Sequence, residues 1–134
     1  MAEIDDRHVD VDAVGARSAI PRISELVDGG ELETAYRAFI MTREQMRAVM
    51  RTARDAGEYP LQLLDNYAQV GRKLARAIEA QPAGFPSATQ AAATVWDATA
   101  KAYDMLAELD PTQAISRVWA EDARRRADHV SVQW

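Results

Sequence analysis

Cysteine is absent from this sequence and histidine occurs only twice, which excludes several kinds of chemistry. Without thiols the chain forms no disulfide and has no thiolate zinc site or cysteine nucleophile. Carboxylate di-iron bundles need Glu-x-x-His pairs, and neither His8 nor His129 follows a glutamate at that spacing. We therefore expect no metal and no cofactor.

Long apolar runs and the common catalytic motifs are missing as well. No segment approaches the roughly 18 consecutive apolar residues that a membrane-spanning helix needs. The acidic N-terminus, MAEIDDRHVD, lacks the apolar centre of a signal peptide. The sequence contains no Gly-x-Ser-x-Gly elbow, phosphate-binding glycine loop or dinucleotide fingerprint. These absences favour a cytoplasmic protein that is not an enzyme and has no membrane partner.

The composition is that of an ordinary folded domain, with 48% hydrophobic and 28% charged residues. Its length of 134 residues suits one domain over 1–134. The net charge of −5 argues against a general polyanion binder. The charge is uneven, however: residues 1–12 carry one arginine and five carboxylates, whereas residues 35–57 carry five arginines and two carboxylates. One face can therefore be basic although the whole chain is acidic.

Apolar residues recur at spacings of three and four almost throughout, which predicts an all-α fold. Proline and glycine divide the pattern into segments. We expect a compact bundle of four to five helices with short extended termini. The predicted helices run from near Ile20 to Gly29-Gly30, from about 31 to 56, from Pro60 to the loop at 81–87, from 88 to 109, and from Pro111 to about Ala123.

Several boundaries stay open at this level. Thr42 and Gln45 match a capping box, so residues 31–56 form either two helices or one helix with Thr42 exposed. Ser87 with Gln90 predicts a second capping box, and Asp110 is expected to cap the last helix. Pro21 predicts that the first helix starts near it or bends there.

Three further features concern packing and the chain ends. Gly71, within an apolar stripe, predicts a close approach of another backbone. The helix at 88–109 is apolar on two faces, so we expect it to be central or to lie in an oligomer interface. Residues 8–11 and 129–132 alternate in polarity, which is typical of extended chain, although frayed ends are the favoured explanation. The inward face of the last helix is predicted to carry Ile115, Val118 and Trp119.

The most distinctive surface feature is a row of arginines at positions 43, 47, 51 and 54, the arginine stripe. On a helical wheel these fall within roughly 80° of one another, beside the apolar face. They span roughly 17 Å of helix. If the helix is continuous, Tyr36 falls among them. The residues predicted to bind nucleic acid or an acidic partner are Arg43, Arg47, Arg51 and Arg54, with Arg72, Lys73 and Arg76 as a second patch.

The stripe fits three interpretations: a solvated or internally paired helix face, a docking surface for a protein, or a contact with nucleic acid. Our first hypothesis is a non-catalytic bundle that works through protein partners or self-association. Nucleic-acid binding is the alternative. Aromatic and methionine side chains at helical spacing indicate core packing more often than a ligand pocket. Those considered for such a pocket are Tyr67, Trp96, Tyr103, Met105 and Trp119.

Two short motifs resemble known families. Thr42–Arg47 (TREQMR) resembles the Thr-x-x-Gln-[Leu/Met]-Arg helix start of small helical subunits of type III CRISPR effector complexes, and Tyr67–Arg72 resembles loosely a second segment of theirs. That resemblance implies a subunit lining a guide–target duplex. The Arg-x4-His spacing of Arg124 and His129 resembles HEPN-type ribonucleases, which implies a dimer acting on RNA, with histidine transferring a proton.

Overall fold

The computed structural model describes residues 11–81, 85–112 and 114–132, and within them the chain forms five helices and no strand. This confirms the predicted all-α bundle. The helices are α2 (Val11–Asp28), α3 (Leu32–Ala56), α4 (Leu61–Ala80), α5 (Ala88–Leu109) and α6 (Ala114–Val132).

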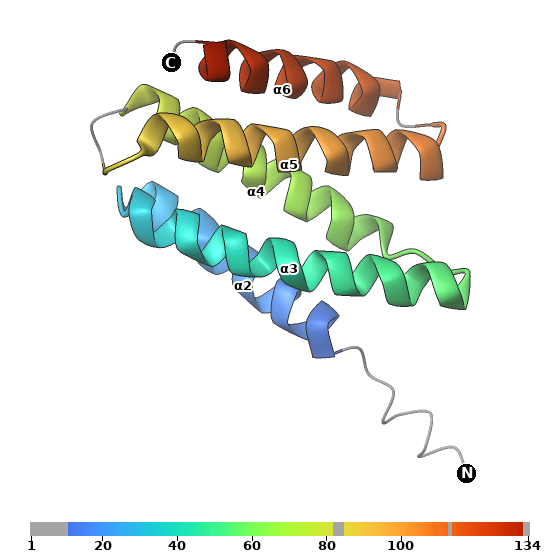
Figure 1. Cartoon of the computed structure of the whole chain (residues 1–134). Helices are drawn as coiled ribbons and strands as arrows, with labels where there is room; N and C mark the ends of the chain where they lie inside the picture. Colours follow the sequence, from blue (N-terminus) through green and yellow to red (C-terminus); the bar gives the residue numbers. More distant parts are fainter. Residues whose placement is uncertain (1–10, 82–84, 113, 133–134) are drawn as a thin grey trace.

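The helices are arranged as a stack with α4 and α5 in its middle (Figure 1). Helix α6 covers the outer side of α5, and α2 pairs with α3 on the opposite side of the stack. The two apolar faces of α5 are therefore buried by α4 and α6. Of the two predicted alternatives, a central helix or an oligomer interface, the fold gives α5 the central position. Helices α3 and α5 contact α4 but make no comparable contact with each other.

Glycines end two of the helices where the sequence predicted. Gly57 follows α3 with φ 72°, and its N–H bonds to the last carbonyls of that helix. Gly30 has φ 77° after α2, and the Glu31 N–H reaches back to the Leu26 carbonyl at 2.9 Å. A left-handed residue at this position satisfies carbonyls that the helix leaves unpaired, and glycine adopts it without strain.

The first two predicted segments needed correction. Helix α2 already contains Val11, and Pro21 lies inside it, so its start is not near Ile20. Residues 32–56 form one uninterrupted helix, but Thr42 is neither exposed nor a cap. Its side chain is buried and Oγ1 donates a hydrogen bond to the Ala38 carbonyl at 2.9 Å. A threonine hydroxyl that bonds four residues back is satisfied inside a helix, so the capping-box pattern was misleading.

Two other predicted caps were wrong. Ser87 precedes α5 in a left-handed conformation, φ 65°, and its side chain makes no capping bond. Asp110 Oδ1 accepts a hydrogen bond from the Thr112 N–H at 3.1 Å, but α6 begins only at Ala114. Asp110 therefore stabilises the turn before the helix rather than its first turn.

The chain ends also differ from the expectation of extended strands. Val11 belongs to α2, and residues 129–132 continue α6 as a helix. Residues 8–10 lie outside the described residues. The acidic stretch at residues 1–12 is described only at its last two positions.

Helix α6 turns a different face inward from the one predicted. Ile115 and Val118 are 49% and 57% exposed, so the prediction was wrong for both, whereas Trp119 is partly buried and packs against the core, as predicted. Small residues face α5 instead, because they let the two helices approach closely. Among the α6 side chains that the structure describes, the buried ones are Ser116, Ala120, Ala123 and Ala127.

A polar cluster joins α4, α5 and α6 at one end of the stack. The buried Trp96 of α5 donates its Nε1–H to Glu79 of α4. Arg126 of α6 pairs with the same carboxylate at 3.3 Å and lies over the Trp96 ring, 5.2 Å from its centroid. A buried indole needs a hydrogen-bond partner, so this cluster determines how the three helices meet.

At Gly71, side chains of both α3 and α5 come close to the backbone of α4. A Cβ at this position would overlap the Thr99 hydroxyl of α5 and lie 3.2 Å from the Phe39 ring of α3. The Phe39 ring also stacks on Tyr67, with centroids 5.2 Å apart and planes 4° from parallel. A close approach at Gly71 is therefore present, but the neighbours are side chains and not the backbone that was predicted.

This packing predicts the effect of adding one methyl group. We expect Gly71→Ala to lower the free energy of unfolding by about 1–3 kcal/mol, since overpacking outweighs the roughly 1 kcal/mol of helix propensity gained. Urea unfolding measures the change. Gly15→Ala is the matched control, because the added methyl meets only the end of the flexible Gln45 side chain. Equal stability of both variants would contradict the close contact at Gly71.

Candidate functional site

All four residues of the arginine stripe line one groove between α3 and α5, which we call the α3–α5 groove. Its volume is about 420 Å³ and its floor is α4. The groove exists because α3 and α5 both pack on α4 without closing against each other. Its lining residues are Arg43, Met46, Arg47, Met50, Arg51, Arg54, Tyr59, Leu64, Tyr67, Asp97, Ala98, Lys101, Ala102 and Met105.

The floor of this groove is apolar and contains methionine. Met46, Leu64 and Tyr67 are almost fully buried beneath it. Met50 and Met105 are half-buried from opposite walls, so their thioether side chains remain accessible. Methionine is unbranched and polarisable, which lets it adapt to partners of different shape. The groove therefore offers an adaptable apolar surface along its cationic edge.

The cations along the edge differ in how they are neutralised. Arg47 forms an ion pair with Glu44 at 2.6 Å. The same carboxylate lies 4.0 Å from Arg43 Nε, too far for a hydrogen bond, and this buried nitrogen has no hydrogen-bond partner among the described residues. Arg51 and Arg54 are exposed, and neither forms an ion pair within the described ranges.

The opposite edge of the groove adds one balanced pair. Lys101 Nζ lies 3.1 Å from Asp97 Oδ2, and both side chains are largely exposed. Such a surface pair contributes at most about 1 kcal/mol and opens readily for a partner. Arg51 and Arg54, the stripe arginines without an ion pair within the described ranges, therefore lie together at one end of the groove.

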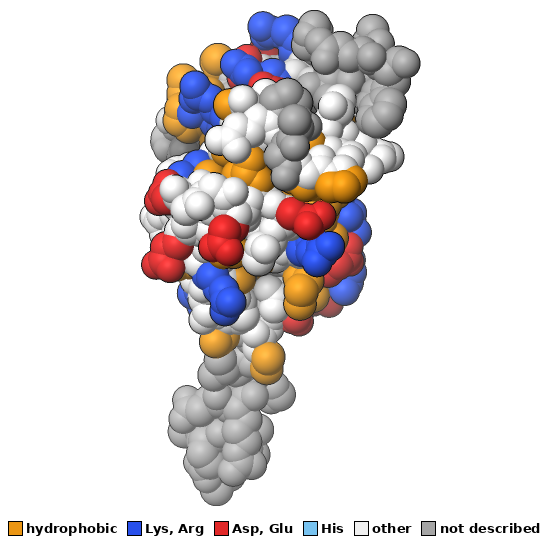
Figure 2. All heavy atoms as spheres, turned by 90° about the vertical axis from the view of Figure 1, so that its left-hand side faces the viewer, with side chains coloured by type: hydrophobic (Ala, Val, Ile, Leu, Met, Phe, Trp, Pro, Cys, Tyr) orange, Lys and Arg blue, Asp and Glu red, His pale blue; other side chains and the backbone are white. Residues whose placement is uncertain are grey.

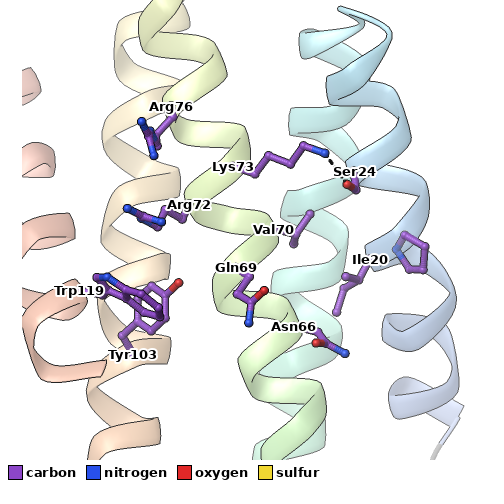
Figure 3. A pocket seen from close by; sticks show the side chains of 11 residues that line it. Ile20, Ser24, Asn66, Gln69, Val70, Arg72, Lys73, Arg76, Tyr103 and Trp119 are labelled. Atoms are coloured by element: carbon purple, nitrogen blue, oxygen red, sulfur yellow. Dashed lines mark hydrogen bonds between the residues drawn. The ribbon is translucent and has the colours of Figure 1, made fainter. Parts of the chain in front are cut away.

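The second predicted patch lies on the opposite face of α4, in a hollow between α2 and α6 that we call the α2–α6 concavity. It measures about 770 Å³ and is shown in Figure 3. Lys73 points toward α2, whereas Arg72 and Arg76 point toward α6. Its lining residues are Ile20, Pro21, Ser24, Asn66, Gln69, Val70, Arg72, Lys73, Arg76, Tyr103 and Trp119.

The structure therefore separates the seven predicted residues into two sites. The four of α3 share the groove and the three of α4 share the concavity. On the face viewed in Figure 2, at the end of the bundle that carries the α2–α3 turn, basic and acidic side chains are intermingled.

The aromatic residues considered for a single pocket are divided in the same way. Tyr67 and Met105 line the groove, Tyr103 and Trp119 line the concavity, and Trp96 lines neither. Tyr36 stacks on Phe85 at 6.0 Å, so it is not among the arginines although α3 is continuous. Sequence reasoning did not identify Lys101, Asp97, Asn66 or Gln69, because only the tertiary packing brings them to these hollows.

Arg124 of the ribonuclease motif lines neither hollow. Arg124 forms an ion pair with Asp104 of α5. His129 belongs to α6, but its side chain lies outside the described residues.

Two general findings concern metals and membranes. In residues 11–81, 85–112 and 114–132, no three histidine or carboxylate side chains gather closely enough to hold a metal ion. None of the helices formed by these residues has the length and apolar character needed to cross a membrane.

Two tyrosines beside the hollows have altered acidity. Burial raises the pKa of Tyr67 well above 10, although Arg43 and Arg47 oppose the shift. Burial likewise raises the pKa of Tyr103 to about 12. The positive charge of Arg72 lowers this pKa, and the negative charge of Asp65 raises it. Both phenols therefore stay protonated in the folded state at pH values where an unfolded tyrosine ionises.

The raised pKa values predict a loss of stability in alkali. The unfolded state releases these protons from about pH 10 upward and the folded state does not, so the stability present below pH 10 falls as pH rises toward 12. We expect Tyr103→Phe to show a shallower decline than wild type in urea unfolding between about pH 9 and 11. Identical slopes for the two proteins would contradict the assignment.

Comparison with protein-family models, curated proteins and solved structures finds no match to this chain, so the two hollows are interpreted from their geometry alone.

Proposed function

We propose that this chain is a non-catalytic docking protein whose α3–α5 groove receives an acidic, amphipathic helix of a protein partner. The observation that carries the proposal is the row of stripe arginines beside the half-buried methionines of the two groove walls, Met50 and Met105. A helix laid in a groove buries its apolar face and presents acidic side chains along one edge. The chemistry of the groove matches both requirements.

The apolar floor supports a helix because it offers a partner more than charge. Burial of apolar surface supplies about 25 cal/mol per Å², whereas exposed ion pairs at the rim mainly set orientation and association rate. Met50 and Met105 are the side chains available for that burial. Arg51 and Arg54, unpaired within the described ranges, are available to an acidic edge.

A protein partner is favoured over nucleic acid by three features. The chain as a whole is acidic, with net charge −5. Glu44 already neutralises part of the charge of Arg43 and Arg47. Tyr36, the aromatic expected to be available for stacking bases, is already packed against Phe85. A phosphate backbone would use the cations but gain nothing from the apolar floor.

The test uses a fluorescent helical peptide with one apolar face bordered by glutamates, and a scrambled peptide of the same composition. We expect the amphipathic peptide to bind in fluorescence anisotropy and the scrambled one to bind at least about tenfold more weakly. The double variant Arg51→Glu, Arg54→Glu and the variant Met50→Gln should each weaken binding by about fivefold to tenfold, through lost charge attraction and lost apolar burial respectively.

Controls separate this function from its alternatives. Arg125→Glu reverses an exposed charge on α6 outside both hollows and should leave peptide binding unchanged. A single-stranded RNA and a duplex are titrated in parallel over a range of salt. Tight, salt-sensitive RNA binding that resists Met50→Gln, with no peptide binding, would overturn the proposal in favour of a nucleic-acid subunit.

A further inference from the structure

The α2–α6 concavity is a cationic hollow in an acidic protein. Of its described lining residues three are basic and none is acidic, although the chain carries 21 acidic and 16 basic residues. Its walls are α2 and α6 and its floor is α4, so it is bounded on two sides. A hollow of about 770 Å³ falls in the range of small-molecule sites.

Arg72 is held in place by aromatic rings. Its guanidinium carbon lies 5.4 Å from the centroid of the Trp119 ring, and that ring packs against Tyr103 with centroids 5.3 Å apart. A guanidinium lying over an indole keeps its hydrogen-bond donors free at its edges. Since the side chain is already ordered, a ligand loses less conformational entropy in engaging it.

Lys73 and Arg76 have different roles. Lys73 Nζ lies 2.8 Å from Asp28 Oδ1 and donates to Ser24 Oγ at 2.7 Å, so its charge is largely neutralised and it braces α2 against α4. Arg76 is exposed and has no carboxylate partner among the described residues. The accessible positive charge of the concavity therefore belongs to Arg72 and Arg76, one helical turn apart.

The remaining polar groups border the same space. Asn66 and Gln69 line it from α4 (Figure 3). The Gln69 amide donates a hydrogen bond to Asp65 at 2.8 Å, so this carboxylate, which does not line the concavity, is already hydrogen-bonded. Asn66 Oδ1 accepts from Gln62 at 3.0 Å, so its own amide N–H groups remain available as donors.

We propose that the α2–α6 concavity binds a small organic ligand bearing a diphosphate or triphosphate group. The phosphate oxygens would be bound by the guanidinium forks of Arg72 and Arg76, which match phosphate geometry, and the organic part would lie against Tyr103, Trp119 and Val70. This site lies across α4 from the α3–α5 groove, and the inference does not depend on the proposed docking function.

The experiment is a titration of the full chain with inorganic pyrophosphate and with ATP, by calorimetry and by tryptophan fluorescence. We expect both to bind with Kd below about 1 mM, with ATP the tighter because its base and ribose bury apolar surface. Arg76→Gln and Arg72→Gln should each weaken binding by about tenfold or more. Arg72→Lys keeps the positive charge but loses the two parallel guanidinium donors, so it should weaken ligand binding nearly as much as Arg72→Gln does.

Matched variants make the result decisive. Arg125→Gln, an exposed arginine outside both hollows, and Arg51→Gln, in the α3–α5 groove, should leave Kd unchanged. Arg76→Gln changes an exposed side chain, so it should fold normally by circular dichroism and unfold in urea like the wild type. No binding of either ligand up to about 5 mM, or binding that Arg72→Gln and Arg76→Gln leave intact, would overturn the proposal.

Discussion

The packing of α4 is the constraint on which the rest of the structure depends. At Gly71 the missing side chain lets Phe39 of α3 and Thr99 of α5 approach the same turn of α4. The stacked rings of Phe39 and Tyr67 extend that contact along the helix. Because interiors pack at nearly crystalline density, a methyl group at this point would separate both neighbours from α4.

Two open hollows follow from the central position of α4. Helices α3 and α5 lie on one face of it, and α2 and α6 flank the other, so a hollow remains between the two flanking helices on each face. The cations of α3 and α4 therefore point into separate spaces. A single polyanion contacting all seven predicted residues would have to pass around the bundle, which the arrangement of the helices does not favour.

The two hollows differ in what surrounds their arginines. Those of the α3–α5 groove border methionines, which suit a large adaptable apolar surface. Arg72 instead lies over Trp119, where its orientation is fixed, and a fixed guanidinium suits a small anion of defined geometry. The same residue type thus supports two kinds of recognition, because its apolar neighbours differ.

The sequence by itself determined that the chain is helical, approximately where four of the helices lie, and that the stripe arginines flank a buried face. The spacing of apolar residues and the positions of proline and glycine are local signals, so they can be read from the sequence without a structure. The tertiary structure alone decided that Ala120 and Ala123, rather than Ile115 and Val118, face α5, because close helix packing favoured small side chains over hydrophobic ones. It likewise decided which cations are paired, since Lys73 meets Asp28 only across two helices.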